Sequence, residues 1–205
     1  NKGYPYTGPR GRTFYDPILI PELPQGNGPM VLSFLDLIEV QVVNAFLKSG
    51  VRWRELRLIA AWAMNRFETP HPFSTQEFLT DGRNLFLKEA AISGNQILTR
   101  LSDNQLSFNA ILMPFVHQLQ FSRQKPCANN KPVKWLPLGQ EGQVALDPAR
   151  KFGQPILDLE GIPTIALFDP FNAGRESIKE IAQWYEIPEN AVAKAIEFEQ
   201  ALLAA

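Results

Sequence analysis

The chain has 205 residues, of which 45% are hydrophobic, and its formal net charge of -1 provides no overall attraction for nucleic acid. A single cysteine, Cys127, excludes an internal disulfide framework, and one cysteine with two histidines is too few ligands for a conventional structural zinc site. We find no apolar run of about 18 residues and no secretory leader, so we expect a soluble cytoplasmic protein that does not enter a membrane.

The first 29 residues are rich in glycine and proline, which excludes a helix of ordinary length there. Three basic residues, Lys2, Arg10 and Arg12, stand among four aromatic ones. Such a segment is typical of a basic hairpin or arm that lies on a phosphate backbone. An extended connector whose aromatic residues cover a neighbouring core has the same composition, and the sequence leaves both interpretations open.

Two helices are predicted to follow. Ser33 and Asp36 have the spacing of a helix cap, apolar residues then recur at helical spacing, and Gly50 allows the left-handed conformation that ends many helices. These signals predict a helix over residues 33–48. The next periodic segment predicts a second helix over residues 52–67.

The second predicted helix carries arginines away from its apolar face. The first 66 residues contain eight basic and five acidic residues, so this part of the chain is locally positive. Because much of the affinity for DNA comes from cations that contact phosphates, we expect any DNA contact here. The candidate DNA-binding residues are Lys2, Arg10, Arg12, Arg52, Arg54 and Arg57.

The middle of the chain has shorter patterns. After two prolines that end the second helix, a short helix is predicted over residues 74–79, before Asp81-Gly82, a dipeptide typical of hairpins. Two short apolar runs then predict strands over residues 85–89 and 96–101.

A longer apolar pattern predicts an amphipathic helix over residues 105–121, with a kink or a new start near Pro114. The next segment has four basic residues, two prolines and no periodicity, so we interpret residues 123–134 as an exposed basic linker. This linker would divide the chain into an amino-terminal region, residues 1–122, and a carboxy-terminal domain, residues 135–205.

The carboxy-terminal domain begins with short extended runs between glycines and prolines. Residues 156–159 and 164–168 are two of these runs, and together they predict a small sheet. Ser177 and Glu180 have capping-box spacing, and Pro188 suits the first turn of another helix. The domain therefore ends in two helices joined by a short turn, which is the shape of a helix-turn-helix.

The charges of this helix pair argue against DNA reading. From Gly174 to Ala205 there are three basic and six acidic residues, and carboxylates that face phosphates oppose binding. We therefore expect the pair to pack within the domain or across a dimer. The candidate dimer residues are Ile178, Ile181, Trp184 and Phe198.

No group of residues predicts an enzyme. The sequence lacks a nucleophile elbow, a phosphate-binding loop, a dinucleotide fingerprint and a zinc-protease motif. Asp147, Asp158 and Asp169 recur at a spacing that suits a metal-dependent hydrolase, but two of them precede proline, where aspartate commonly starts a turn. His71 has no second ligand at a usable spacing, and His117 has no catalytic partner nearby. We therefore predict no catalytic residue, no metal and no cofactor.

A resemblance to a known family appears in the last third of the chain. The pattern DP-x-x-x-FGQPIL-x-x-x-GIPT, followed by FNAGRESIKEIAQWYEIPENAVAKAIEFE, spans residues 147–199. It resembles the small domain of unknown function found in VapB-type antitoxins of bacterial toxin–antitoxin pairs. Many members carry an arginine shortly before the second proline of the pattern, where this chain has Gly161, so no role of that arginine is carried over.

A second resemblance lies upstream. The segment LSFLDLIEVQVVNAFLKSGVRWRELRLIAAWA, followed by HPF and TDGRNLF, is similar to longer antitoxins of this group that carry a MerR-like winged DNA-binding domain. In such domains a helix-turn-helix precedes a wing, and the wing precedes a helix pair. The first 15 residues look like the wing, so the resemblance implies that the recognition helices lie upstream of Asn1.

These patterns predict an α+β fold that is mainly helical, with a wing and a helical hairpin first, small β segments in the middle, and a small sheet with a helix-turn-helix-like pair last. The resemblance implies a non-enzymatic, homodimeric antitoxin of a type II pair that neutralises a PIN-like ribonuclease toxin and contributes to autoregulatory operator binding. The acidic metal site of such a toxin would attract the basic linker, whose candidate toxin-binding residues are Arg123, Lys125, Lys131 and Lys134. The alternative is a dimerisation or scaffold protein with no nucleic-acid role, which the near-neutral charge and the acidic last helices favour.

Overall fold

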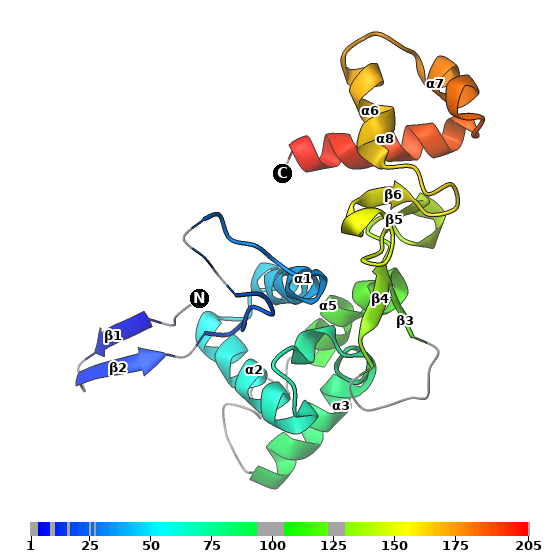
Figure 1. Cartoon of the computed structure of the whole chain (residues 1–205). Coiled ribbons are helices and arrows are strands. Elements are labelled where there is room, and N and C mark those ends of the chain that lie inside the picture. The colour runs from blue at the N-terminus through cyan, green and yellow to red at the C-terminus, as the bar shows by residue number, and fades with distance from the viewer. Residues whose placement is uncertain are drawn as a thin grey trace. The chain divides into compact units, whose positions relative to one another are not determined.

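The structure, a computed structural model, describes residues 4–8, 11–15, 17–24, 26, 28–93, 105–122 and 130–204 (Figure 1). The chain divides into two compact units. Unit 1 comprises Asn1–Val116 with Arg123–Lys131, and unit 2 comprises His117–Ser122 with Pro132–Ala205. Helices dominate, with a small four-stranded antiparallel sheet in unit 2, so the predicted α+β class is confirmed.

Unit 1 starts with an antiparallel hairpin of β1 (Tyr4–Gly8) and β2 (Gly11–Tyr15). The pairing runs from Tyr4 opposite Tyr15 to Gly8 opposite Gly11. The segment therefore has the hairpin form of the first interpretation.

Helix α1 (Phe34–Lys48) begins at the predicted cap. The Asp36 amide donates to Oγ of Ser33, and the Ser33 amide donates to Oδ2 of Asp36, which completes the capping box. The helix is followed by Gly50 at φ 87°, a conformation that glycine adopts without a Cβ clash. Helix α2 (Trp53–Phe67) follows, so both predicted helices are confirmed.

Between residues 74 and 89, the short predicted helix is confirmed from Gln76 on, but the predicted turn and the predicted strand after it are wrong. After η1 (Pro72–Ser74), a single helix α3 (Gln76–Ser93) runs through the expected turn at Asp81-Gly82 and through the expected strand at residues 85–89. Packing explains the difference, because Phe78, Gly82 and Phe86 are all buried at helical spacing. A Cβ at residue 82 would lie 3.2 Å from a ring carbon of Phe78, so glycine here permits close packing within the helix. The expected strand at residues 96–101 lies outside the described residues.

An aromatic cluster forms the centre of unit 1. Phe73 of η1 packs edge-on against Phe78 with ring centroids 5.0 Å apart, and Trp62 packs in the same way against Phe86. Phe67 of α2 contacts both Trp62 and Phe78. These contacts tie α2, η1 and α3 together around one core.

Helix α5 (Gln105–Gln118) confirms most of the predicted helix and contains Pro114. Its last three expected residues form strand β3 (Leu119–Phe121) instead. The Leu136 amide donates to the carbonyl of Gln118, so the chain turns here into the sheet of unit 2. Among the described residues, no helix is long and apolar enough to cross a membrane.

The sheet of unit 2 has the order β3-β4-β5-β6, and every neighbouring pair is antiparallel. Its further strands are β4 (Pro132–Trp135), β5 (Val144–Leu146) and β6 (Pro155–Leu157), with the short helical turns η2 (Gln140–Gly142) and η3 (Lys151–Gly153) between them. The expected basic linker therefore gives way to a strand at Pro132.

Three helices complete unit 2: α6 (Thr164–Asn172), α7 (Ile178–Tyr185) and α8 (Glu189–Leu203). The prediction of a strand at residues 164–168 is wrong, because these residues begin α6 and bury Thr164, Leu167 and Phe168 at helical spacing. Figure 1 shows α6 and α7 lying against α8. The predicted capping box of Ser177 and Glu180 is confirmed at the start of α7.

The core of unit 2 joins the sheet to these helices. It includes fully buried residues from β5, β6, α6, α7 and α8, namely Val144, Leu157, Leu167, Ile181, Val192 and Ala195. The closing helix pair is therefore an integral part of the fold of unit 2.

Candidate functional site

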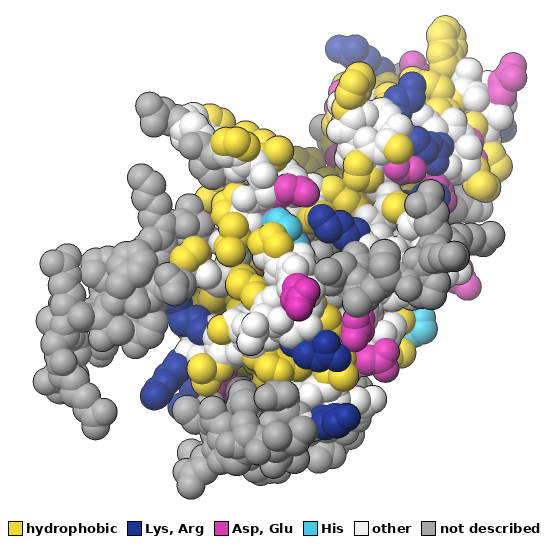
Figure 2. Space-filling view, turned by 60° about the horizontal axis from the view of Figure 1, so that its bottom comes forward, with side chains coloured by type: hydrophobic (Ala, Val, Ile, Leu, Met, Phe, Trp, Pro, Cys, Tyr) yellow, Lys and Arg dark blue, Asp and Glu magenta, His cyan; other side chains and the backbone are white. Residues whose placement is uncertain are grey.

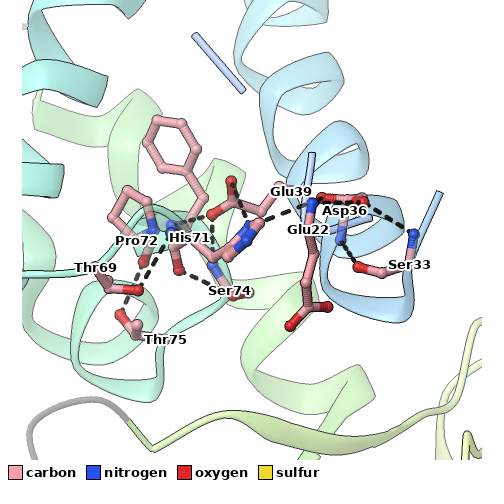
Figure 3. Close-up of polar contacts among 10 residues, drawn as sticks. Glu22, Ser33, Asp36, Glu39, Thr69, His71, Pro72, Ser74 and Thr75 are labelled. Carbon is pink, nitrogen blue, oxygen red and sulfur yellow. Dashed lines mark hydrogen bonds and ion pairs between the residues drawn. The ribbon is translucent and has the colours of Figure 1, made fainter. Parts of the chain in front are cut away.

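A buried polar cluster in unit 1 brings together residues distant in the sequence (Figure 3). Asp36 and Glu39 come from the first two turns of α1, and His71 precedes η1. All three side chains are buried, with Glu39 only 1% exposed. Nδ1 of His71 lies 3.8 Å from Oδ1 of Asp36 and 3.8 Å from Oε2 of Glu39, a distance for ion pairing but too long for hydrogen bonds.

Each carboxylate of the cluster also accepts backbone N–H groups. The amides of Phe73 and Ser74 donate to Oε1 of Glu39 at 2.7 and 3.3 Å. The amide of Glu22 donates to both carboxylate oxygens of Asp36, at 3.1 and 3.2 Å. The cluster thus fastens the segment around Glu22 and the turn before α3 to the start of α1.

The environment shifts two pKa values in the cluster. Burial raises the pKa of Glu39 because it disfavours the charged carboxylate, while His71 and the two amide donors oppose the rise. Interaction with the Glu39 side chain raises the pKa of His71, while burial opposes that rise. A protonated His71 therefore balances part of the buried negative charge.

The cluster has the character of a structural anchor. His71, for which the sequence offers no second metal ligand at a usable spacing, lies in the loop between α2 and η1. In the part of the chain that is described, no three His, Cys, Asp or Glu side chains are arranged to hold a metal ion. Sequence reasoning missed the cluster, because only folding brings the turn at residue 71 to the first turns of α1.

The candidate DNA-binding arginines of α2 lie near its start. Arg52 and Arg54 are exposed and flank Trp53, which is 56% exposed, while Arg57 is half-buried. The face of the molecule in Figure 2 carries Lys and Arg side chains in several places, with acidic and hydrophobic ones between them. The side chains of the other three candidates, Lys2, Arg10 and Arg12, lie outside the described residues.

The four candidate toxin-binding residues do not share one environment. Arg123 and Lys125 lie outside the described residues, and Lys131 is exposed just before β4. Lys134 lies within β4, and its ammonium donates to both carboxylate oxygens of Asp158 at 2.8 and 3.1 Å. Lys134 is thus held by a contact inside unit 2.

Asp158 also accepts hydrogen bonds from Arg150, a residue that the sequence patterns did not single out. Nη1 of Arg150 donates to the carbonyl of Asp158 at 2.8 Å and to Oδ1 of the same residue at 3.1 Å. A Cβ at residue 161 would lie 3.0 Å from Nη2 of Arg150, so Gly161 leaves room for the guanidinium. No local pattern in the sequence links Arg150 to Asp158, because the two residues lie eight apart with β6 between them.

The candidate dimer residues separate into two groups. Ile181 and Phe198 are buried in the core of unit 2, and Ile178 is half-buried against that core. Trp184 is 80% exposed on α7. Of the four, Trp184 is the one whose side chain is available at the surface of unit 2.

The three regularly spaced aspartates take separate roles. Asp147 starts a turn, because its Oδ1 accepts the amide of Ala149, as expected for aspartate before proline. Asp158 pairs with two cations, and Asp169 is exposed on α6. A different carboxylate, that of buried Glu199 in α8, accepts a hydrogen bond from the hydroxyl group of Thr164. This hydrogen bond links α8 to the start of α6.

Comparisons with known proteins agree with this architecture. No family model matches the chain. A curated relative, named "Putative antitoxin VapB45", from Mycobacterium tuberculosis (strain ATCC 25618 / H37Rv), is 26% identical over 188 residues, which cover 87% of this chain and 76% of the relative. The crystal structure of Rv2018 from Mycobacterium tuberculosis matches with a TM-score of 0.67 and 25% identity, covering 85% of this chain and 83% of that one. Over most of its length, the chain is therefore similar in sequence to a protein named as a VapB antitoxin.

Proposed function

We propose that this chain is the antitoxin of a bacterial type II toxin–antitoxin pair, a non-enzymatic protein that neutralises a PIN-like ribonuclease by binding it directly. One observation carries the proposal: the 26% identity to the relative named as an antitoxin extends over 87% of the chain. The similarity thus includes both units, and it agrees with the antitoxin-like pattern of residues 147–199.

The surface of unit 2 supports a role in protein contact. Its last two helices expose several carboxylates that would oppose DNA phosphates. The exposed acidic residues of these helices and their turn are Glu180, Glu186, Glu189 and Glu197. We therefore assign toxin binding and dimerisation to unit 2 and the adjoining basic segment.

The proposed contribution to operator binding belongs to unit 1. The β1–β2 hairpin has the form of a wing, and the exposed side chains of Arg52 and Arg54 suit contacts with phosphates. Such contacts position a protein on DNA without reading its sequence. Unit 1 would thus supply affinity for the operator.

Co-expression with the product of the adjacent reading frame tests the antitoxin role. The wild-type chain should restore growth to cells that express this toxin and should co-purify with it. A variant with Arg123, Lys125 and Lys131 changed to glutamine should lose part of this protection, because it keeps the sheet of unit 2 but lacks three cations. A matched control with Lys48, Lys88 and Lys179 changed to glutamine also loses three cations, all from exposed helical positions, and should protect fully.

Equal protection by both triple variants would remove the basic segment from the toxin contact. A wild-type chain that neither protects cells nor co-purifies with the toxin would refute the antitoxin proposal itself.

A second candidate function is dimerisation or scaffolding without nucleic acid, and the 80% exposure of Trp184 favours it. An exposed indole on a short helix is an amphipathic group typical of protein interfaces. Binding to the DNA upstream of the gene at increasing salt concentrations separates the two candidates. A steep loss of affinity supports operator binding, and no binding at low salt supports the scaffold.

A further inference from the structure

The turn between β5 and β6 presents an aromatic side chain to solvent in an unusual backbone conformation. Lys151, Phe152 and Gly153 have φ angles of 46, 56 and 76°, so three consecutive residues are left-handed. The phenyl group of Phe152 is 102% exposed, the largest exposed fraction among the described large hydrophobic residues. Two of these three positions carry side chains that disfavour this conformation.

The turn is fastened on several sides. Oδ1 of Asp147 accepts the amide of Ala149, and the carbonyl of Arg150 accepts the amide of Gly153. The guanidinium of Arg150 is held by the carbonyl and the carboxylate of Asp158. L residues keep a left-handed conformation only where surrounding contacts impose it. The contacts of Asp147, Arg150 and Asp158 impose it on this turn.

The fold of unit 2 gains nothing from the Phe152 side chain. A left-handed residue other than glycine costs about 1–2 kcal/mol, and a fully exposed phenyl group recovers none of that cost by burial. Glycine or asparagine would suit the same backbone better. Strained conformations of this kind cluster at binding sites, where a fixed side chain avoids the entropy cost of ordering on contact.

A second copy of this chain is a poor occupant for this side chain. In a two-fold contact centred on Phe152, the exposed Lys151 of one copy would approach Lys151 of the other. Repulsion between these ammonium groups disfavours a homodimer at this turn, whereas a different protein can place a carboxylate opposite Lys151. A single projecting phenyl group instead suits a pocket on a different protein.

We propose that Phe152 is the apolar anchor by which this chain holds its toxin. The phenyl group enters an apolar pocket on the toxin, and a carboxylate at the rim of that pocket faces the ammonium of Lys151. The inference rests on the proposed antitoxin function and identifies the surface that performs it. The rigid turn presents the phenyl group in its binding position before the toxin arrives.

The test compares the affinities of full-length variants for the purified product of the adjacent reading frame. Phe152→Asn removes the apolar group but suits a left-handed backbone, so the variant should fold as well as the wild type. Its Kd should rise about 30-fold or more, the effect typical of a central anchor residue. Phe152→Leu should recover part of the affinity, because it keeps an apolar side chain. Leu203→Asn removes an exposed apolar side chain from the end of α8 and should leave the Kd unchanged.

Two other results would overturn the inference and leave the antitoxin role intact. One is a Phe152→Asn variant that binds the toxin as tightly as the wild type. The other is a variant that changes the oligomeric state of the chain in gel filtration with light scattering but keeps its toxin affinity, because the occupant would then be a second copy. Failure of the wild-type chain to bind the toxin would instead refute the antitoxin proposal, and the anchor with it.

Discussion

Two substitutions of Glu39 distinguish its role as a hydrogen-bond acceptor from the effect of its negative charge. Glu39→Ala removes the acceptor of two buried N–H groups, those of Phe73 and Ser74. A buried donor without a partner costs about 1–3 kcal/mol, and the second contact is the longer one, so we expect unit 1 to lose about 2–4 kcal/mol. Glu39→Gln keeps an oxygen acceptor and removes the cost of burying a charge. The stability of unit 1 in this variant should therefore lie within about 1 kcal/mol of the wild-type value.

Hydrogen exchange followed by mass spectrometry measures this difference on peptides that contain Phe73 and Ser74. At about 1.4 kcal/mol for each factor of ten, Glu39→Ala should accelerate exchange of these amides by about 30- to 700-fold. Peptides of α8 belong to unit 2 and provide the internal control. Equal acceleration in the two variants would show that charge, rather than the acceptor, holds the turn. Unchanged exchange in Glu39→Ala would refute the anchoring role.

Three further predictions concern pH, the sheet of unit 2 and DNA. Folding raises the pKa of His71 from its usual 6.5, so its stabilisation is complete below about pH 6.5 and is lost as the pH rises through the folded pKa. Urea unfolding followed by fluorescence from pH 6 to 9 should show this loss, and His71→Gln should flatten the profile. Asp158→Ala removes the acceptor shared by two partly exposed cations and should lower the free energy of unfolding of unit 2 by about 1–2 kcal/mol, measured by thermal denaturation; an unchanged value would mean that the pairs are only surface contacts. Changing Arg52 and Arg54 to glutamine should reduce the slope of log affinity for operator DNA against log salt by about 2, and an unchanged slope would place the phosphate contacts elsewhere.

Features encoded within a few residues were predictable from the sequence. The capping spacings at Ser33 and Ser177 located the starts of α1 and α7, because a cap depends on groups three residues apart. Apolar periodicity likewise located α2 and most of α5. These elements are also the ones whose local propensity agrees with their packing.

Elements decided by distant packing were not predictable in this way. Asp81-Gly82 is a hairpin signal in isolation, but the burial of Phe78 and Phe86 on one face favours a continuous helix. Residues 164–168 are a short apolar run, which periodicity alone does not assign to a strand or to a buried helix. Contact with α8 favours the helix.

The contacts of the candidate site residues also join distant parts of the sequence, so they could not be predicted from local patterns. The basic residues of the expected linker could be listed from the sequence, but only the structure pairs Lys134 with Asp158. The amide of Phe73 and the carboxylate of Glu39 are 34 residues apart, so no local pattern links them. The exposure of Phe152 likewise depends on the turn that Arg150 and Asp158 fasten.

Titration calorimetry of the purified full-length chain with the product of the adjacent reading frame tests the central claim most directly. The antitoxin account predicts a saturable complex with a Kd below about 1 µM, together with loss of the ribonuclease activity of the toxin at equivalence. No heat of binding and no inhibition, with both proteins shown to be folded, would contradict the account.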